Sequence, residues 1–269
     1  MRMNMNKTIY LIIVAVALSV VSASARTLFV GHRGSLWGVE NTREAFINGA
    51  KAGYDYIECD LRVAGDGVFV LSHDEATTRI GGNLTVAEAT LPQLRAERYT
   101  QTRGGETYSG SLCTFEEYLD ICREYNVLPV IELKWATGIN NNDCSNINRL
   151  IECITANGFR NKCIILTSMR GCLDYIHENH PDVKLQFLAK TDWLEQFDWC
   201  VSAGMDVDIR RDCVTTATME LFHAAGRLVN VWTVNDIDEC NRLIEMGCDF
   251  ITTDSIEPVK ISQSRATEK

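Results

Sequence analysis

Ionisable side chains are concentrated in one stretch of the chain, residues 31–74. His32 and His73 lie near its two ends, and the carboxylates Glu58 and Asp60 stand between them at alternating positions. The surrounding runs are short and apolar, so few structural needs explain so many ionisable groups. Carboxylates hold divalent cations, and histidines transfer protons near neutral pH. The stretch therefore predicts one half of a metal-dependent active site with two catalytic histidines.

A second pattern further along the chain predicts the other half of this site. Glu132 and Lys134 alternate in the run Val-Ile-Glu-Leu-Lys-Trp. Alternate side chains of a strand point to one face, so Glu58 and Asp60 should lie together, roughly 6.6 Å apart along the strand. Glu132 and Lys134 should share a face for the same reason. Three carboxylates around one point suit a hard cation, Ca²⁺ or Mg²⁺, with positions left open for substrate oxygens.

Strand-like and helical runs alternate through most of the chain. The expected main strands are 27–30, 54–61, 127–133, 163–166, 184–188, 205–209, 228–234 and 249–252. The expected helices are 43–52, 115–125, 146–157, 169–178, 192–203, 217–225 and 237–246. This alternation predicts parallel βαβ units that close into a single α/β domain, a (β/α)8 TIM barrel. An open doubly wound sheet is the alternative, but no Gly-x-Gly-x-x-Gly follows the first strand.

A barrel would bring these distant polar residues together. Active sites of TIM barrels lie at the C-terminal ends of the strands. The polar residues at or after those ends are His32, Glu58, Asp60, Glu132, Lys134, Trp232 and Asp254. We therefore expect them to converge on one mouth. Trp232 has two interpretations, a place in a substrate pocket or packing in the barrel core.

A hairpin is expected to bring His73 close to the carboxylates. The Asp-Gly dipeptide at 66–67 is typical of a two-residue turn. Such a turn pairs Gly65 with Val68 and places Asp60 opposite His73. A bulge at Gly65 would shift this register by one residue.

The charged groups suit hydrolysis of a phosphodiester, which resists attack because its negative charge repels nucleophiles. The cation, Arg33 and Lys134 would neutralise charge as it develops. One histidine would remove a proton from the nucleophile, and the other would protonate the leaving alkoxide. Other interpretations remain for the two cations: Arg33 could pair with Glu40 at the barrel rim, and Lys134 could pair only with Glu132.

The N-terminus resembles an export signal. Arg2 and Lys7 precede an apolar run at 9–21, and Ala23-Ser24-Ala25 gives a small-residue cleavage pattern. We expect a signal peptide at 1–25 and one catalytic domain at 26–269. The protein should then be periplasmic or secreted, without stable membrane insertion after cleavage. An uncleaved N-terminal anchor is the alternative.

Composition limits the partners. The formal net charge of −10 disfavours nucleic-acid binding, and it leaves an anionic substrate to a local positive site. The chain has 11 cysteines and no Cys-x-x-Cys pattern, so a zinc or thioredoxin-like motif is absent. We expect most cysteines to be small buried apolar residues, with a few disulfides possible. The sequence leaves the oligomeric state open.

The ordered motifs resemble the glycerophosphodiester phosphodiesterase family over essentially the whole chain after residue 25. They are Gly-His-Arg-Gly with Glu-Asn-Thr, Ile-Glu-Cys-Asp, an Asp-Gly turn, His-Asp, Ile-Glu-Leu-Lys, Trp-Thr-Val-Asn and Thr-Thr-Asp. The resemblance implies a TIM barrel, a divalent metal, and hydrolysis of glycerophosphodiesters to an alcohol and glycerol 3-phosphate. By position it implies metal ligation by Glu58, Asp60 and Glu132, catalysis by His32 and His73, and phosphate contacts from Arg33 and Lys134.

The chain departs from the family pattern in a few places. Val39 stands where proline usually precedes Glu-Asn-Thr, and the end of the last motif reads Ser255-Ile256. These departures indicate a different pocket for the alcohol. Residues 79–111, where the family often carries a small insertion, are expected to be irregular with one helix after Thr85 and no separate cap domain. The alternatives are a phospholipase D-like barrel acting on lysolipids, which needs an apolar rim, and a non-catalytic binding barrel.

Overall fold

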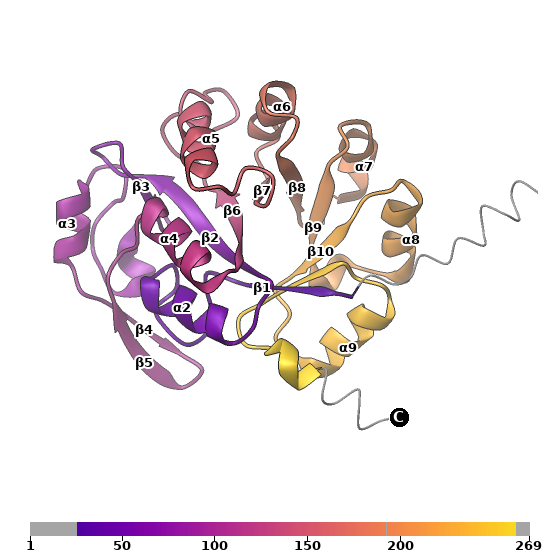
Figure 1. Cartoon of the computed structure of the whole chain (residues 1–269), viewed down its shortest axis with the longest axis horizontal. Coiled ribbons are helices and arrows are strands. Elements are labelled where there is room, and N and C mark those ends of the chain that lie inside the picture. Colours follow the sequence, from indigo (N-terminus) through magenta and orange to yellow (C-terminus); the bar gives the residue numbers. More distant parts are fainter. Residues whose placement is uncertain (1–25, 192, 262–269) are drawn as a thin grey trace, which may run out of the picture.

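The computed structural model describes residues 26–191 and 193–261. The expected signal peptide lies outside these residues. Strands form the centre of the molecule and helices surround them (Figure 1). Of the helices described, none is both long enough and apolar enough to cross a membrane.

The predicted TIM barrel is confirmed. Its parallel strands are β1 (Leu28–Gly31), β2 (Tyr56–Val63), β6 (Leu128–Leu133), β7 (Ile164–Thr167), β8 (Lys184–Ala189), β9 (Asp206–Arg210), β10 (Val229–Trp232) and β11 (Phe250–Thr253). Neighbouring strands pair in this order, and β1 pairs with both β11 and β2, which closes the barrel. The strand ends at the mouth are thereby fixed relative to one another.

Helices cover the outside of the barrel. They are α2 (Arg43–Lys51), α4 (Phe115–Tyr125), α5 (Ile147–Ala156), α6 (Arg170–Asn179), α7 (Trp193–Ser202), α8 (Thr216–Ala224) and α9 (Ile237–Glu245). Their ends lie close to the expected ones, and side-chain caps fix the starts of α4, α8 and α9. At α4, for example, the Thr114 side chain accepts a hydrogen bond from the Glu117 backbone, and Glu117 accepts one from the Thr114 N–H at 2.9 Å.

The barrel and its surrounding helices enclose two of the apolar clusters of the protein. Outward-facing strand residues such as Ile57, Cys59 and Ile131 pack against the helices in the larger cluster. Inward-facing residues such as Tyr56 and Phe250 fill the base of the barrel. This apolar base supports the polar residues that lie nearer the mouth.

The structure describes all 11 cysteines, none of which is in a disulfide, and most are buried. This agrees with their expected role as small apolar residues. The sulfurs of Cys144 and Cys172 lie 4.0 Å apart.

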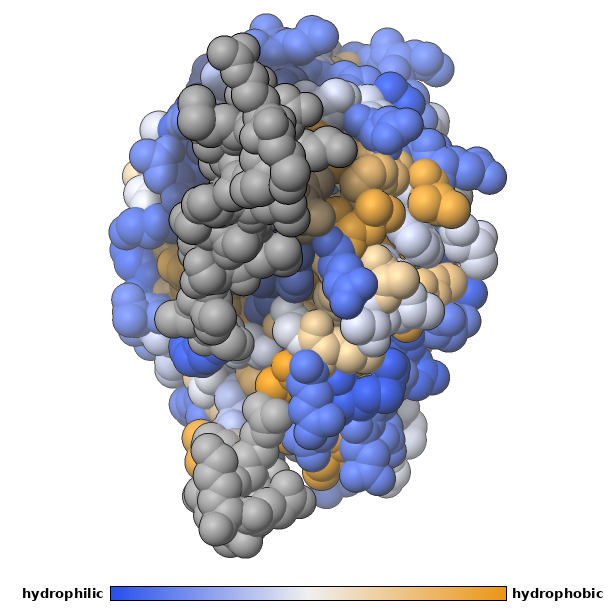
Figure 2. All heavy atoms as spheres, turned by 90° about the vertical axis from the view of Figure 1, so that its right-hand side faces the viewer, coloured by the Kyte–Doolittle hydropathy of each residue, from blue (hydrophilic) through white to orange (hydrophobic). Residues whose placement is uncertain are grey.

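Hydrophilic residues cover much of the described surface on the face shown in Figure 2. Figure 2 shows the side on which α8 lies, where hydrophilic residues surround a smaller group of apolar ones. The most exposed large apolar side chains are Trp135, Leu194, Leu221, Leu228, Ile237 and Val259. Scattered apolar exposure of this kind is normal for a globular protein.

The hairpin register differs by one residue from the predicted one. In the β2–β3 pair, with β3 at Phe69–Leu71, Leu61 lies opposite Leu71, and the Ser72 N–H donates to the Asp60 carbonyl at 2.9 Å. Asp60 is therefore aligned with Ser72 and not with His73. The turn holds three residues, 65–67, and Gly67 has φ +82°, the left-handed conformation that such turns place at their last position.

Residues 77–110 are more regular than expected. They form η1 (Thr77–Ile80), α3 (Leu91–Ala96) and a hairpin of β4 (Tyr99–Arg103) and β5 (Glu106–Gly110). Leu94 and Tyr99 are fully buried in a separate small apolar cluster. The expected helix corresponds to α3. The hairpin was not predicted, because its strands read Tyr-Thr-Gln-Thr-Arg and Glu-Thr-Tyr-Ser-Gly and give no apolar alternation. We call residues 77–110 the insertion.

Candidate active site

Three carboxylates from two adjacent strands form the centre of the site. Asp60 of β2 lies directly opposite Glu132 of β6, and Glu58 lies two residues before Asp60. Each of the three offers an oxygen, and these oxygens lie within 4.8 Å of one another. Glu58 is 3% exposed and Asp60 is fully buried. The residues predicted from alternation are thus brought to one point.

Two cations balance part of this negative charge. The Lys134 Nζ lies 3.0 Å from Asp60 Oδ1 and also donates to Glu132, and Arg33 Nε lies 3.3 Å from Asp60 Oδ2. Burial opposes their charge, but the surrounding carboxylates raise the pKa of both Arg33 and Lys134. Arg33 Nη1 also donates to Glu40 at 3.1 Å, so the expected rim ion pair is present together with the contact to Asp60.

The three carboxylates have different electrostatic environments. Burial and the charges of Asp60 and Glu132 raise the pKa of Glu58 well above its ordinary value, and burial with Asp60 also raises that of Glu132. For Asp60, burial is outweighed by Lys134 and Arg33, which hold its pKa far below the ordinary range. Asn41 adds a hydrogen bond of 2.7 Å to Asp60 Oδ2. Asp60 is therefore the carboxylate of the three whose surroundings most favour the ionised form.

The cluster fits a hard divalent cation. Glu58 Oε2 accepts the Arg33 backbone N–H at 2.7 Å, but Glu58 Oε1 is buried and has no hydrogen-bond partner. Such an oxygen is costly unless something binds it. An all-carboxylate donor set is that of Ca²⁺ or Mg²⁺ rather than of a softer metal. Glu58, Asp60 and Glu132 are the residues that could hold the ion.

His32 is held by an aspartate from the other end of the chain. Its Nδ1 lies 2.9 Å from Asp254 Oδ1. Asp254 also accepts hydrogen bonds from Asn235 at 2.7 Å and from Arg103 at 3.0 Å. Burial opposes its charge, but these partners keep the pKa of Asp254 well below the ordinary range. An ionised Asp254 orients the ring and leaves Nε2 for proton transfer.

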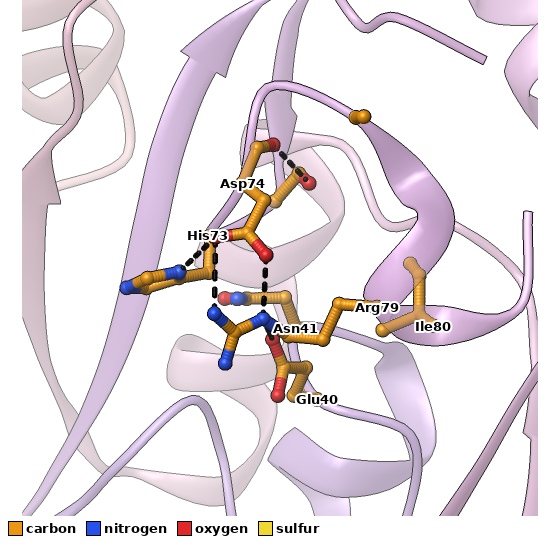
Figure 3. A pocket seen from close by; sticks show the side chains of 8 residues that line it. Glu40, Asn41, His73, Asp74, Arg79 and Ile80 are labelled. Atoms are coloured by element: carbon orange, nitrogen blue, oxygen red, sulfur yellow. Dashed lines mark hydrogen bonds and ion pairs between the residues drawn. The ribbon is translucent and has the colours of Figure 1, made fainter. Parts of the chain in front are cut away.

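His73 is held in a similar way by the residue that follows it. Figure 3 shows its ring beside Asp74, with Arg79 on the other side of that carboxylate and Glu40 beyond. The His73 Nδ1 lies 2.6 Å from Asp74 Oδ1, and Arg79 Nε lies 2.6 Å from Asp74 Oδ2. The Arg79 hydrogen bond, followed by those of His73, lowers the pKa of Asp74 to about 2. Burial lowers the pKa of His73, against the opposing charge of Asp60.

Most of the predicted site residues line one cavity of about 440 Å³ at the mouth of the barrel. Among the predicted site residues, His32, Arg33, Glu58, His73, Glu132, Lys134 and Trp232 line it. Trp232 is only partly buried, and its Nε1 has no hydrogen-bond partner. Its side chain therefore lines the cavity and is not packed in the barrel core. The apolar side chains of Leu166, Met169 and Leu188 also line this cavity.

Sequence reasoning missed the groups that orient the histidines. Asp254 was expected at the mouth but without a role, and the signal for Asp74 was present in the His-Asp dipeptide. Arg103 gave no signal, because it lies in the insertion and is far from the mouth in sequence. Its Nη1 also donates to the Ser35 carbonyl at 2.5 Å, which ties β4 to the loop after β1.

The chain belongs to a known family of hydrolases. The Glycerophosphoryl diester phosphodiesterase family matches residues 26–258, and the chain is a member of it. It is therefore a phosphoric diester hydrolase built on a TIM barrel. The expected family assignment is confirmed.

Individual relatives agree with this assignment. A glycerophosphodiester phosphodiesterase of Caldanaerobacter subterraneus subsp. tengcongensis is 27% identical over 242 residues, which is 86% of this chain and 96% of the relative. Among solved structures, a phosphodiesterase of Oleispira antarctica in complex with the product sn-glycerol-3-phosphate has a TM-score of 0.76 at 18% identity, covering 90% of this chain and 97% of that one. A glycerophosphodiester phosphodiesterase of Parabacteroides distasonis has a TM-score of 0.71 at 21% identity, with 91% and 100% covered. At these identities the two structures support the fold alone.

Proposed function

We propose that the protein is an exported, metal-dependent enzyme that hydrolyses glycerophosphodiesters to an alcohol and glycerol 3-phosphate. The observation that carries this proposal is the buried cluster of Glu58, Asp60 and Glu132 beside two aspartate-held histidines in one cavity. Membership of the family supports the reaction, and the Oleispira antarctica phosphodiesterase of the same fold was solved with sn-glycerol-3-phosphate as its product.

In this proposal the chain's own residues divide the work. Glu58, Asp60 and Glu132 hold one Ca²⁺ or Mg²⁺ ion, which when bound supplies positive charge next to the phosphate. Arg33 and Lys134 lie against the same cluster and add donors for phosphate oxygens. Binding of the cation and of the phosphate would loosen the ion pairs that now join Lys134 to Asp60 and Glu132.

His32 and His73 provide the acid–base pair. Each has its Nδ1 beside an aspartate oxygen, so each presents Nε2 as the working nitrogen. One accepts the proton of the attacking hydroxyl group, and the other donates a proton to the oxygen of the leaving alcohol. The ionised aspartates stabilise the imidazolium that forms during the reaction.

A lysolipid substrate is less well supported. Acyl chains would need an apolar rim around the mouth. Among the described residues lining the cavity, Trp135 is the large apolar side chain that is mostly exposed, at 62%. A single exposed tryptophan suits a small headgroup better than an acyl chain.

The test is a substrate panel with purified residues 26–269. We expect glycerol 3-phosphate to be released from glycerophosphocholine or another small glycerophosphodiester, to stop with chelator, and to return with Ca²⁺ or Mg²⁺. Glu58→Gln is the matched control, because it keeps the side-chain volume and removes a charge from the cation site. Failure to release glycerol 3-phosphate from every member of the panel in either metal would refute the proposed reaction.

Export needs a separate test. The basis for it is the N-terminal sequence pattern at 1–25. Expression of the full chain should give a protein outside the cytoplasm whose mass corresponds to cleavage after Ala25. A full-length protein retained in the cytoplasm would contradict export without affecting the proposed reaction.

A further inference from the structure

Asp208 is an ionisable residue of the cavity that the proposed mechanism does not use. It lies in the middle of β9, next to Leu188 of β8 and Asn230 of β10. Its neighbours Val207 and Ile209 pack outward into the main core. Asp208 itself lines the same cavity as His32, Glu132 and Trp232. It therefore occupies the inner face of the barrel, on the side away from β2.

The carboxyl group of Asp208 has an unmet hydrogen-bonding capacity. The residue is 3% exposed, and its Oδ1 is buried without a hydrogen-bond partner. The polar side chains on the neighbouring strands, Gln186, Asn230 and Thr252, form hydrogen bonds with one another and not with this oxygen. Asn230 Nδ2 donates to Gln186 Oε1 at 3.3 Å, and Thr252 Oγ1 donates to Asn230 Oδ1 at 3.1 Å. A buried carboxyl group left in this state costs stability, which suggests that a ligand completes it.

A matching donor lies on the next strand. Trp232 of β10 lines the cavity too, and its buried Nε1–H has no acceptor. Asn230, which lies opposite Asp208, is two residues before Trp232 on the same face of β10. Neighbouring strands β9 and β10 thus place one free acceptor and one free donor in the lining of the same cavity. A hydroxyl group, which both donates and accepts, is the kind of ligand group that suits such a pair.

Asp208 is not a fourth ligand of the proposed cation. Among the described residues, the group of ligand atoms that lie mutually within 4.8 Å comprises Glu58, Asp60 and Glu132 alone. Burial, and then the charge of Glu132, raise the pKa of Asp208 well above its ordinary value. This shift favours the neutral carboxyl group, which binds a hydroxyl group without the desolvation cost of a charge.

We propose that Asp208 and Trp232 form a hydroxyl-binding subsite, and that Asp208 binds the primary hydroxyl group of the substrate's glycerol. This rests on the proposed function. The secondary hydroxyl group of glycerol is on the carbon next to the phosphoester, so it stays near the phosphate. The primary hydroxyl group is one carbon further away, and it is the one that can reach beyond the carboxylate cluster. The subsite would thereby select glycerol over shorter or less hydroxylated alcohols.

The experiment compares two substrates in wild type, Asp208→Leu and Asp208→Asn. One substrate is glycerophosphocholine, and the other is the phosphocholine ester of propane-1,2-diol, which keeps the secondary hydroxyl group but lacks the primary one. Wild type should prefer the first about 10- to 100-fold in kcat/KM, the usual worth of a buried hydrogen bond to substrate. Asp208→Leu should abolish this preference by lowering kcat/KM for glycerophosphocholine alone. Asp208→Asn should keep part of it.

Two controls separate recognition from folding. Asp206→Asn changes a carboxylate two residues earlier on β9, which accepts the Leu228 N–H at 2.9 Å outside the cavity, and it should leave the preference intact. The melting temperature of Asp208→Leu should not fall, because an unpartnered buried carboxyl group is removed. An equal loss for both substrates, or no change for either, would overturn the subsite.

A binding measurement keeps the inference independent of turnover. Calorimetry with glycerol 3-phosphate and with propane-1,2-diol 1-phosphate should show tighter binding of the first to wild type and equal binding to Asp208→Leu. If wild type hydrolyses neither ester, the proposed function fails while this comparison still decides the subsite. Equal affinity of wild type for the two phosphates would refute the hydroxyl contact.

Discussion

Glu58→Gln should make the cation-free protein more stable while removing its response to a cation. The exchange keeps the volume of the side chain and the acceptor for the Arg33 backbone N–H, which now bonds at 2.7 Å. It removes a carboxylate that is 3% exposed and repelled by two others. The carboxylate cluster therefore lowers the stability of the cation-free protein and raises the stability of the cation-bound protein.

The magnitude follows from the distances. Two unit charges 4.8 Å apart, the limit of the cluster, repel by about 3.5 kcal/mol at an effective dielectric constant of 20. Glu58 faces two such neighbours, and Arg33 offsets part of the repulsion. We therefore expect Glu58→Gln to raise the unfolding free energy in chelator by about 1–3 kcal/mol at pH 8. A cation at 100 times its dissociation constant should stabilise wild type by about 2.7 kcal/mol and the variant far less.

The sign of the pH dependence follows from the raised pKa of Glu58 and Glu132. A carboxyl group with a higher pKa in the folded state binds its proton more tightly there, so its contribution favours folding at low pH. That contribution declines as pH rises from the unfolded pKa to the folded one. The stability of cation-free wild type should thus fall as pH rises above about 4.5, with a shallower fall in Glu58→Gln.

Denaturant unfolding in chelator, with and without added Ca²⁺ or Mg²⁺, measures all three quantities. Glu152→Gln, on the surface of α5, is the matched control and should change neither the stability in chelator nor the response to cation. If Glu58→Gln destabilises the cation-free protein and keeps the full cation-induced shift, the assignment of Glu58 to a cation site is wrong.

Three other predictions concern the groups that orient His32 and the lysine that faces the phosphate. Asp254→Asn should lower kcat about 100-fold or more with little change in KM, because His32 loses the carboxylate that fixes its tautomer; steady-state kinetics and a melting curve would check this, and an unchanged kcat would contradict it. Arg103→Gln should lower kcat roughly 10-fold and shift the pH–rate profile, because one of the partners of Asp254 is lost; a uniform loss of folded protein with an unshifted profile would show a structural role only. Lys134→Met should raise KM and lower kcat at every pH, and it should weaken inhibition by inorganic phosphate, whereas undiminished phosphate inhibition would argue against a phosphate contact.

Most of the barrel could be predicted from the sequence because its strands and helices carry strong local signals. The α4 segment, for example, has a capping box at Thr114 and an apolar face that leave little choice of boundary. The carboxylates could be predicted as well, since strand alternation fixes the faces of Glu58 and Asp60 whatever the tertiary detail. These parts depend on interactions between residues close in sequence.

The parts that failed depend on details without a local signal. The turn at 65–67 could close with two or three residues, and only the pairing of Ala64 with Val68 decides that Ser72 aligns with Asp60. The contact of Arg103 with Asp254 joins residues 151 positions apart. Nothing in the sequence around an arginine on an exposed hairpin indicates which distant carboxylate it meets.

The insertion has a closer relation to the chemistry than its place outside the barrel suggests. Asp254 holds His32 and is held in turn by Arg103, from β4. The aspartate beside His73 is held by Arg79, from η1. Both arginines belong to the insertion. One segment therefore supports both histidines, although His32 follows β1 and His73 follows β3. A change that displaces the insertion should therefore affect both histidines together and leave the carboxylates of β2 and β6 in place, so that activity is lost while cation binding remains.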